Sequence, residues 1–219
     1  MIADRGAEGR VNSAHLTPDE AAALTVAPRG NTRSSGYERD PHDWYVEDRE
    51  SVAAMFRHIH NGERTVWHDP CCGGGNILRV AADLGIAMTG ADLIDRADGK
   101  YPVRDFLEDA AAYAGILTNP PFRLAVPIVR HALKHVENGG PVAIMAQAKF
   151  LYSQGRFSLF TMPECERVVI FSHRPSMPPG EMLAREGEAC RGGGFHDFFA
   201  VVWRVGKTKP GVVIEWANW

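Results

Sequence analysis

The stretch from Arg64 to Leu84 reads RTVWHDPCCGGGNILRVAADL and sets the pattern for the whole chain. Its first residues, Arg64–His68, are typical of a short strand. Three consecutive glycines, Gly73–Gly75, then let the backbone turn tightly and approach a ligand closely. The apolar spacing over Gly75–Leu84 predicts a helix, which Gly85 ends. A strand, a glycine-rich loop and a helix in this order predict one unit of an α/β fold.

The same alternation continues on both sides of this stretch. Helices are expected at residues 48–60, 124–136 and 153–160, and strands at 86–92, 114–118, 141–147, 167–171 and 198–205. Alternating units of this kind predict a mostly parallel sheet with helices on both faces. Such a fold binds its ligand at the carboxyl ends of the strands, and every motif described below lies at such an end.

Composition divides the chain into an arm and one domain. Residues 1–36 are rich in Gly, Ala, Arg and Ser and predict a flexible N-terminal arm with one helix start at Thr17. Residues 37–219 are expected to form a single domain. Within it, residues 172–197 separate two predicted strands, and loops of this length are usually functional or disordered. We therefore expect a substrate-contacting loop at 172–197.

Composition also excludes several classes of protein. The chain has 219 residues, 45% hydrophobic and 23% charged, which suits a globular domain. No apolar run approaches the roughly 20 residues that cross a bilayer, and no signal-peptide core is visible, so a cytoplasmic protein without membrane contact is expected. The four cysteines and nine histidines lack metal-ligand spacing, so no metal is expected. Because the net charge is −3, nucleic-acid contact has to come from a local patch.

Carboxylates beyond the glycine loop suit a nucleoside. Asp92 ends the predicted strand 86–92, where it can accept hydrogen bonds from two ribose hydroxyls. Asp105 offers an acceptor to an adenine amino group, and Phe106 offers a flat apolar face to the ring. Leu78 occupies the third glycine position of a dinucleotide fingerprint, which disfavours a nicotinamide cofactor. Taken singly, these residues also fit a tight turn or a solvated acid, so their order in one unit favours a cofactor site.

The sequence Asn119-Pro120-Pro121-Phe122 follows the predicted strand 114–118. Two prolines fix the backbone and remove two N–H donors, so the loop presents carbonyl oxygens. The Asn119 side-chain oxygen and the Pro120 carbonyl can both accept from one NH₂ group, which favours a tetrahedral nitrogen with a free lone pair. Phe122 offers an aromatic face to a planar substrate. The alternative is a rigid turn with Phe122 in the core.

These motifs resemble those of the S-adenosylmethionine (SAM)-dependent N6-adenine DNA methyltransferases, especially the small solitary enzymes of phages and prophages. The resemblance covers residues 40 to about 205. It implies a Rossmann-like class I SAM-dependent methyltransferase fold, in which a mostly parallel seven-stranded sheet has an antiparallel last strand. It also implies that residues 37–219 are a methyltransferase domain with site-specific, adenine-specific activity on DNA, within EC class 2.1.1.

The resemblance assigns roles to named residues. The catalytic residues it implies are Asn119, Pro120, Pro121 and Phe122. The cofactor-binding residues are Tyr45, Asp69, Pro70, Cys71, Gly73, Gly75, Asp92, Leu93, Asp105, Phe106 and Asn119. Tyr45 belongs to Asp43–Val46, which resembles the segment that packs over the methionine end of the cofactor. The transfer needs no cysteine nucleophile, so Cys71 and Cys72 are expected to pack.

The expected partner is DNA, with RNA as the alternative. A base stacked in a duplex cannot reach such a site, so the target adenine has to be flipped out. The expected substrate-binding residues are Lys149, Arg156, Arg174 and Arg191, with Arg123 and Arg185 as further phosphate-contact candidates. Each of these residues also fits a solvated surface charge.

Three other functions stay open. RNA base methylation, at adenine N6 or guanine N2, is one, because Phe122 stands where many of the DNA enzymes have Tyr. Protein glutamine methylation is a second, although the short polar arm does not match the helical substrate domain of those enzymes. A non-catalytic module that binds SAM or DNA is the third, and the intact loop from Asn119 to Phe122 disfavours it. The oligomeric state and the recognition sequence stay open too.

Overall fold

The computed structural model of the chain describes residues 42–60 and 65–219. Its elements are α2 (Arg49–Ile59), β1 (Trp67–Asp69), α3 (Asn76–Asp83), β2 (Met88–Gly90), η2 (Phe106–Glu108), β3 (Gly115–Thr118), α4 (Ala125–His135), β4 (Pro141–Gln147), η3 (Ala148–Leu151), η4 (Gln154–Arg156), α5 (Phe157–Thr161), β5 (Cys165–Phe171), α6 (Gly180–Glu186), η5 (Gly187–Cys190), β6 (Phe198–Arg204) and β7 (Val213–Ala217), where η marks a 3₁₀ turn. The predicted arm at 1–36 and its boundary with the domain lie outside the described residues and stay predictions.

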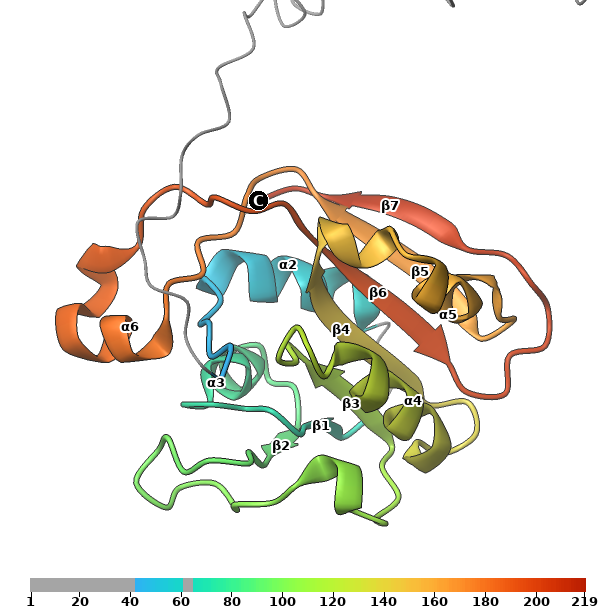
Figure 1. Ribbon diagram of the computed structural model, residues 1–219, viewed down its shortest axis with the longest axis horizontal. Coiled ribbons are helices and arrows are strands. Elements are labelled where there is room, and N and C mark those ends of the chain that lie inside the picture. The colour runs from blue at the N-terminus through green and yellow to red at the C-terminus, as the bar shows by residue number, and fades with distance from the viewer. Residues whose placement is uncertain (1–41, 61–64) are drawn as a thin grey trace, which may run out of the picture. The chain divides into compact units, whose positions relative to one another are not determined.

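One sheet arranges the seven strands in the order β2-β1-β3-β4-β6-β5-β7 (Figure 1). β6 is antiparallel to both of its neighbours, and all the other pairs are parallel. The predicted α/β fold with a mostly parallel seven-stranded sheet is confirmed. The winding reverses at β1, because β2 lies on one side of it and β3 on the other. Doubly wound sheets bind their ligands at such a reversal, beyond the carboxyl ends of the strands.

Helices cover both faces of the sheet (Figure 1). α2 and α3 pack on one face, where Met145 of β4 and Ala200 of β6 are buried with them. α4 and α5 pack on the other face, against Ile144 and Val201 of the same strands. Strands covered on both faces have no polar side, which explains the continuous apolar runs of β4 and β6. No helix among the described residues is long and apolar enough to span a bilayer.

Some elements differ from their predicted bounds. β1 and β2 are only three residues long and pair with each other over that length. The predicted helix at 153–160 divides into η4 and the short α5, because Gly155 is a poor helix former. β6, which the sequence placed last, is antiparallel to its neighbours as expected. β7 follows β6, in a segment where no strand was predicted. It pairs in parallel with β5 at the edge of the sheet.

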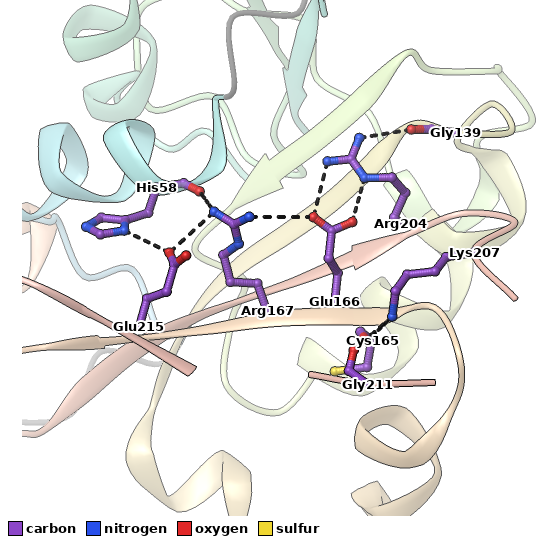
Figure 2. Close-up of polar contacts among 9 residues, drawn as sticks. All are labelled: His58, Gly139, Cys165, Glu166, Arg167, Arg204, Lys207, Gly211 and Glu215. Carbon is purple, nitrogen blue, oxygen red and sulfur yellow. Dashed lines mark hydrogen bonds and ion pairs between the residues drawn. The ribbon is translucent and has the colours of Figure 1, made fainter. Parts of the chain in front are cut away.

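Hydrogen bonds and ion pairs of charged side chains connect the edge of the sheet formed by β5, β6 and β7 to α2 (Figure 2). Arg167 of β5 donates hydrogen bonds to the carbonyl of His58 in α2 and to Glu215 of β7, the latter at 3.3 Å. The His58 ring contacts Glu215 at 2.9 Å. Arg204 of β6 pairs with Glu166 of β5 at 2.6 Å. The contacts therefore join the last three strands of the chain to the first described helix.

Candidate functional site

Loops from distant parts of the sequence meet at the carboxyl edge of the parallel strands. Asp69 ends β1, Asp92 follows β2, Asn119 follows β3 and Lys149 follows β4. β6 runs in the opposite direction, so its start lies at the same edge as the end of β5. The loop at 172–197, which joins these two strands, therefore begins and ends beside the site.

The glycine loop between β1 and α3 is fixed by its backbone conformation and by two carboxylates. Gly73 and Gly75 have φ angles of 53° and 81°, which residues with a side chain rarely adopt. The Gly73 amide donates to Asp92 Oδ2 at 2.7 Å. The Cys71 amide donates to Asp69 Oδ1 at 3.0 Å. The loop is thus tied to the ends of both β1 and β2.

A cavity of about 280 Å³ lies beside this loop, and we call it the glycine-loop cavity. The predicted cofactor residues that line it are Tyr45, Asp69, Pro70, Cys71, Gly73, Asp92, Leu93, Asp105, Phe106 and Asn119. Gly75, the N-cap of α3, does not line it, and a Cβ at this glycine would meet the Tyr101 ring. Motifs that lie far apart between Tyr45 and Asn119 therefore meet around one space.

Burial perturbs the titratable groups in the wall of this cavity. Asp69 is 1% exposed, and burial raises the pKa of its carboxyl to about 8. Burial, with the nearby Asp69 and Asp92, also raises the pKa of the Cys71 and Cys72 thiols well above the usual range. Protonated thiols are poor nucleophiles, which agrees with the expectation that both cysteines pack. Within the described residues, no cluster of His, Cys, Asp and Glu side chains could hold a metal ion.

Asp105 and Phe106 differ in how much of each side chain is exposed to the cavity. Asp105 is half-buried, and its Oδ1 accepts from the Leu107 amide at 2.9 Å, which caps η2. Phe106 is only 5% exposed, and its ring meets His131 edge-on at 4.8 Å. Only a small part of the Phe106 ring thus faces the cavity, so less of the flat surface expected for an adenine is available there.

The Asn119 side chain is held in one orientation. Its Nδ2 donates to Glu47 Oε1 at 2.7 Å and to the Tyr45 carbonyl at 3.3 Å. A backbone carbonyl can only accept, so the nitrogen has to face it. Asn119 Oδ1 is buried and has no hydrogen-bond partner among the described residues. An unpaired buried oxygen costs about 1–3 kcal/mol, and a ligand N–H would satisfy it.

A second cavity of about 220 Å³, the aromatic cavity, adjoins the first at Tyr45, which lines both. The rings of Tyr45 and Phe122 stack with centroids 5.6 Å apart and 18° between their planes. Lys149 Nζ lies 5.5 Å from the centroid of the Phe122 ring, within reach of a cation–π interaction. The long loop contributes residues 175–178 and 192–196 to the wall.

The Asn-Pro-Pro-Phe loop runs along both cavities. Asn119 and Pro121 line the glycine-loop cavity, whereas Phe122 lines the aromatic cavity. Pro120 lines a further cavity, together with Phe122 and Lys149. Phe122 also packs against the core, so its ring is both a structural contact and part of a cavity wall.

Two predicted substrate-binding residues donate hydrogen bonds to backbone carbonyls. Arg156 donates to three backbone carbonyls within residues 149–152 at 2.7–2.9 Å, so it closes the turn after β4. Arg191 donates to the carbonyls of Val46 and Ser176 at 3.0 Å, and its side chain is 13% exposed. These acceptors take up part of each guanidinium, and Arg156 also lines the cavity that Pro120, Phe122 and Lys149 share, so substrate binding by both residues stays a prediction.

The other predicted cations lie nearer to solvent. Arg174 pairs with Asp197 at 2.7 Å, and both side chains are more than half exposed. Arg185 pairs with its neighbour Glu186 on the outside of α6, and Arg123 lies 3.9 Å from Asp43. Of the four substrate-binding residues expected from the sequence, Lys149 is the one that lines the aromatic cavity.

Comparisons with known proteins agree with this geometry at the level of the fold. No protein-family model and no curated protein sequence matches the chain. Among solved structures, the methyltransferase subunit of a type I restriction-modification system from Streptococcus thermophilus matches with a TM-score of 0.56 at 11% identity, over 75% of this chain and 45% of that one. A modification subunit assigned to a type I restriction enzyme of Vibrio vulnificus YJ016 matches at 0.53 and 14%, over 75% and 45%.

A further match, to a Listeria monocytogenes protein assigned as a class I SAM-dependent methyltransferase, has a TM-score of 0.53 and 11% identity, over 84% of this chain and 68% of that one. The fold is that of a class I SAM-dependent methyltransferase. The chain spans less than half the length of the two type I subunits that it matches.

Two residues at the site were not named as site residues from the sequence: Glu47, which no motif included, and Trp44, which lies within the segment Asp43–Val46. Glu47 directly follows the segment Asp43–Val46; it is 5% exposed and contacts Asn119. Trp44 packs on the glycine loop, where a Cβ at Gly73 would lie 2.5 Å from its Nε1. Neither contact is local in sequence, so periodicity and spacing could not reveal it.

Proposed function

We propose that this chain transfers a methyl group from SAM to the exocyclic N6 nitrogen of adenine in DNA. The observation that carries the proposal is the Asn119 side chain, which donates twice through its nitrogen and leaves its oxygen buried without a partner. An oxygen in this state is suited to accept one hydrogen of a substrate NH₂ group.

The glycine-loop cavity has groups that fit SAM. Asp92 accepts from the amides of Gly73 and Ile94, and a carboxylate has about four acceptor sites, so lone pairs remain for ribose hydroxyls. Asp105 offers the free part of its carboxylate to the adenine amino group. Tyr45 and the glycine loop are proposed to hold the methionine end. When bound, SAM supplies a methyl group on a positively charged sulfur.

The chain's own residues then orient the acceptor nitrogen. Asn119 Oδ1 and the Pro120 carbonyl accept the two amino hydrogens, so the nitrogen lone pair is released from conjugation with the ring. A nitrogen–carbon bond forms as the carbon–sulfur bond breaks, and the amino group gives up one proton. The products are N6-methyladenine, S-adenosylhomocysteine and that proton. Alignment of this kind accounts for much of the acceleration in such transfers.

The aromatic cavity is the proposed place for the target base. Phe122 and Tyr45 offer ring faces, and Lys149 offers a positive charge beside them. Extruding a base from a duplex costs a few kcal/mol, and stacking on aromatic rings can offset this cost. The type I restriction-modification subunits that share the fold support DNA as the substrate class.

The deciding experiment follows labelled methyl from SAM into duplex DNA, single-stranded DNA, total RNA and protein, with digestion of each product to identify the modified group. We expect N6-methyladenine in DNA, and none with the Asn119→Ala variant. Label in RNA or protein instead would overturn DNA as the substrate. Binding of SAM by calorimetry without any transfer would make the chain a non-catalytic module.

A further inference from the structure

We propose that Glu47 is a positioning residue for the transfer, because its carboxylate orients the Asn119 amide so that Oδ1 is left for the substrate amino group. This inference rests on the proposed function and extends it to a residue outside the Asn-Pro-Pro-Phe loop. Glu47 lines the glycine-loop cavity, but it acts on the substrate through Asn119.

Two amide NH₂ groups converge on the Glu47 carboxylate. Asn119 Nδ2 donates to Oε1 at 2.7 Å, and Asn76 Nδ2 donates to Oε2 at 3.2 Å. Asn76 Nδ2 also donates to the Glu47 backbone carbonyl at 2.9 Å, which fixes the orientation of the Asn76 amide. Each carboxylate oxygen of Glu47 therefore faces a nitrogen that can only donate.

This arrangement requires an acceptor at both oxygens of residue 47, and a carboxylate is the side chain that supplies two. If Asn119 rotated its amide by half a turn, its oxygen would face the carboxylate and the Tyr45 carbonyl. Two pairs of acceptors would then meet in a buried place. Glu47 thus disfavours the flipped amide, which would present an NH₂ group to the NH₂ group of the substrate.

The burial of Glu47 works against the charged form of its carboxyl. The residue is 5% exposed, and burial raises the pKa of its carboxyl. The hydrogen bonds from Asn119 and Asn76 and the positive charge of Arg191 act in the opposite direction and favour the charged form. Replacing a buried charged group by an apolar side chain of similar size is often neutral or stabilising. A buried acid at this position therefore points to a role beyond filling space.

The first test is Glu47→Gln, which keeps the shape of the side chain. It replaces one of the two carboxylate oxygens, both acceptors, by an NH₂ donor. Whichever way the introduced amide turns, its NH₂ faces the NH₂ of Asn119 or that of Asn76. We expect kcat for methyl transfer to fall about 10- to 100-fold, in the range that misplaced reacting groups cost. The Kd for SAM, measured by calorimetry, should change far less. Glu50→Gln, an exposed acid in the first turn of α2, is the matched control and should leave both unchanged.

The second test is a reciprocal exchange. In Asn119→Asp alone, two carboxylates face each other at the site and activity should fall strongly. In the double variant Glu47→Gln/Asn119→Asp, the introduced glutamine can donate to the introduced aspartate and accept from Asn76. The remaining aspartate oxygen is left for the substrate. The aspartate oxygen that replaces Asn119 Nδ2 still meets the Tyr45 carbonyl, so recovery is partial, and we expect the double variant to be more active than Asn119→Asp alone.

A merely structural role for Glu47 predicts no such rescue, because the double variant would then be at least as impaired as the worse single one. Absence of rescue, or a Kd for SAM that rises as much as kcat falls, would overturn the inference. Failure of the proposed function looks different, because the wild-type chain would then methylate none of the four acceptors. In that case, NMR still tests whether Glu47 orients the Asn119 amide. Hydrogen exchange of the Asn119 side-chain NH₂ group should be faster in Glu47→Gln and unchanged in Glu50→Gln.

Discussion

At the scale of single residues, the site depends on which atoms can donate and which can accept. Asn119 combines two satisfied donors with one unsatisfied oxygen, and burial keeps water from that oxygen. Native proteins rarely leave a buried polar atom unpaired, and Asn119 lines the glycine-loop cavity, so we infer that a ligand pairs with its oxygen there.

Asn119→Ala removes this acceptor. We expect methyl transfer to fall by about 100-fold or more, the size of effect that loss of one aligned hydrogen-bond partner has in other active sites. The Kd for SAM, measured by calorimetry, should stay close to that of the wild type. Wild-type turnover in this variant would remove Asn119 from the mechanism.

Asp69 gives the stability of the protein an unusual pH dependence. Its pKa is about 8 in the folded chain, against 3.8 as the ordinary value, so the folded state keeps a proton that the unfolded state loses. The free energy of unfolding should therefore fall as pH rises from 4 to 8, by up to about 1.4 kcal/mol per pH unit. His68 has the opposite effect between pH 4 and 6.5, because burial lowers its pKa from 6.5 to about 4.

The slope due to Asp69 is therefore clearest between pH 6.5 and 8. Denaturant unfolding of the wild type and of Asp69→Asn over this range measures it, because the variant has no proton to lose at this position. If the free energy of unfolding changed equally with pH in both proteins, Asp69 would not be the source of this pH dependence.

At the scale of elements, the long loop at 172–197 is bound along the segment that precedes α2. The Val46 amide donates to the Pro178 carbonyl at 3.0 Å, and the Gly180 amide donates to the Trp44 carbonyl at 2.9 Å. The start of α6 lines the glycine-loop cavity, while the flanks of the loop line the aromatic cavity. The loop was expected to contact substrate. It forms part of the wall of the glycine-loop cavity and part of the wall of the aromatic cavity.

Arg191 holds this contact together, so Arg191→Ala should loosen it. Two backbone carbonyls lose their charged donor, and we expect a loss of about 1–3 kcal/mol of stability. Hydrogen exchange at the Val46 and Gly180 amides should become faster. Arg174→Ala is the control, because it breaks an exposed pair that contributes about 1 kcal/mol or less. Equal protection of the two amides in both variants would show that Arg191 does not hold the loop.

At the scale of the whole molecule, the polar network of Figure 2 joins parts of the chain that are far apart in sequence. His58 and Glu215 are separated by 157 positions, and Arg167 contacts both. Arg167 Nε is also buried without a partner, so this guanidinium is held at some cost. The network fixes the late strands β5 and β7 to α2.

Arg167→Ala should therefore destabilise the whole fold. We expect the free energy of unfolding to fall by about 1–3 kcal/mol, because His58 loses a donor to its carbonyl and Glu215 loses a cation. Chemical denaturation measures the change. Arg57→Ala, on the exposed side of α2, should stay within about 0.5 kcal/mol of the wild type. A loss of the same size in both variants would mean that the network adds nothing specific.

The sequence by itself determined what depends on neighbours along the chain. The strand, glycine loop and helix of β1 and α3, the apolar run of β4 and the rigid loop after β3 all follow from local periodicity, glycine and proline. These features were sufficient to predict the fold class. Of the eleven residues that the resemblance named for the cofactor, ten line the glycine-loop cavity.

Only the tertiary structure decided which side chains meet. Glu47 and Asn119 are 72 positions apart, and Arg191 reaches Val46 over 145 positions. The same packing gave Arg156 backbone acceptors in the turn after β4, and it placed β7 at the edge of the sheet. Hydrogen bonds of this kind depend on how the strands pair and how the helices pack, and that geometry leaves no periodic signal in the sequence.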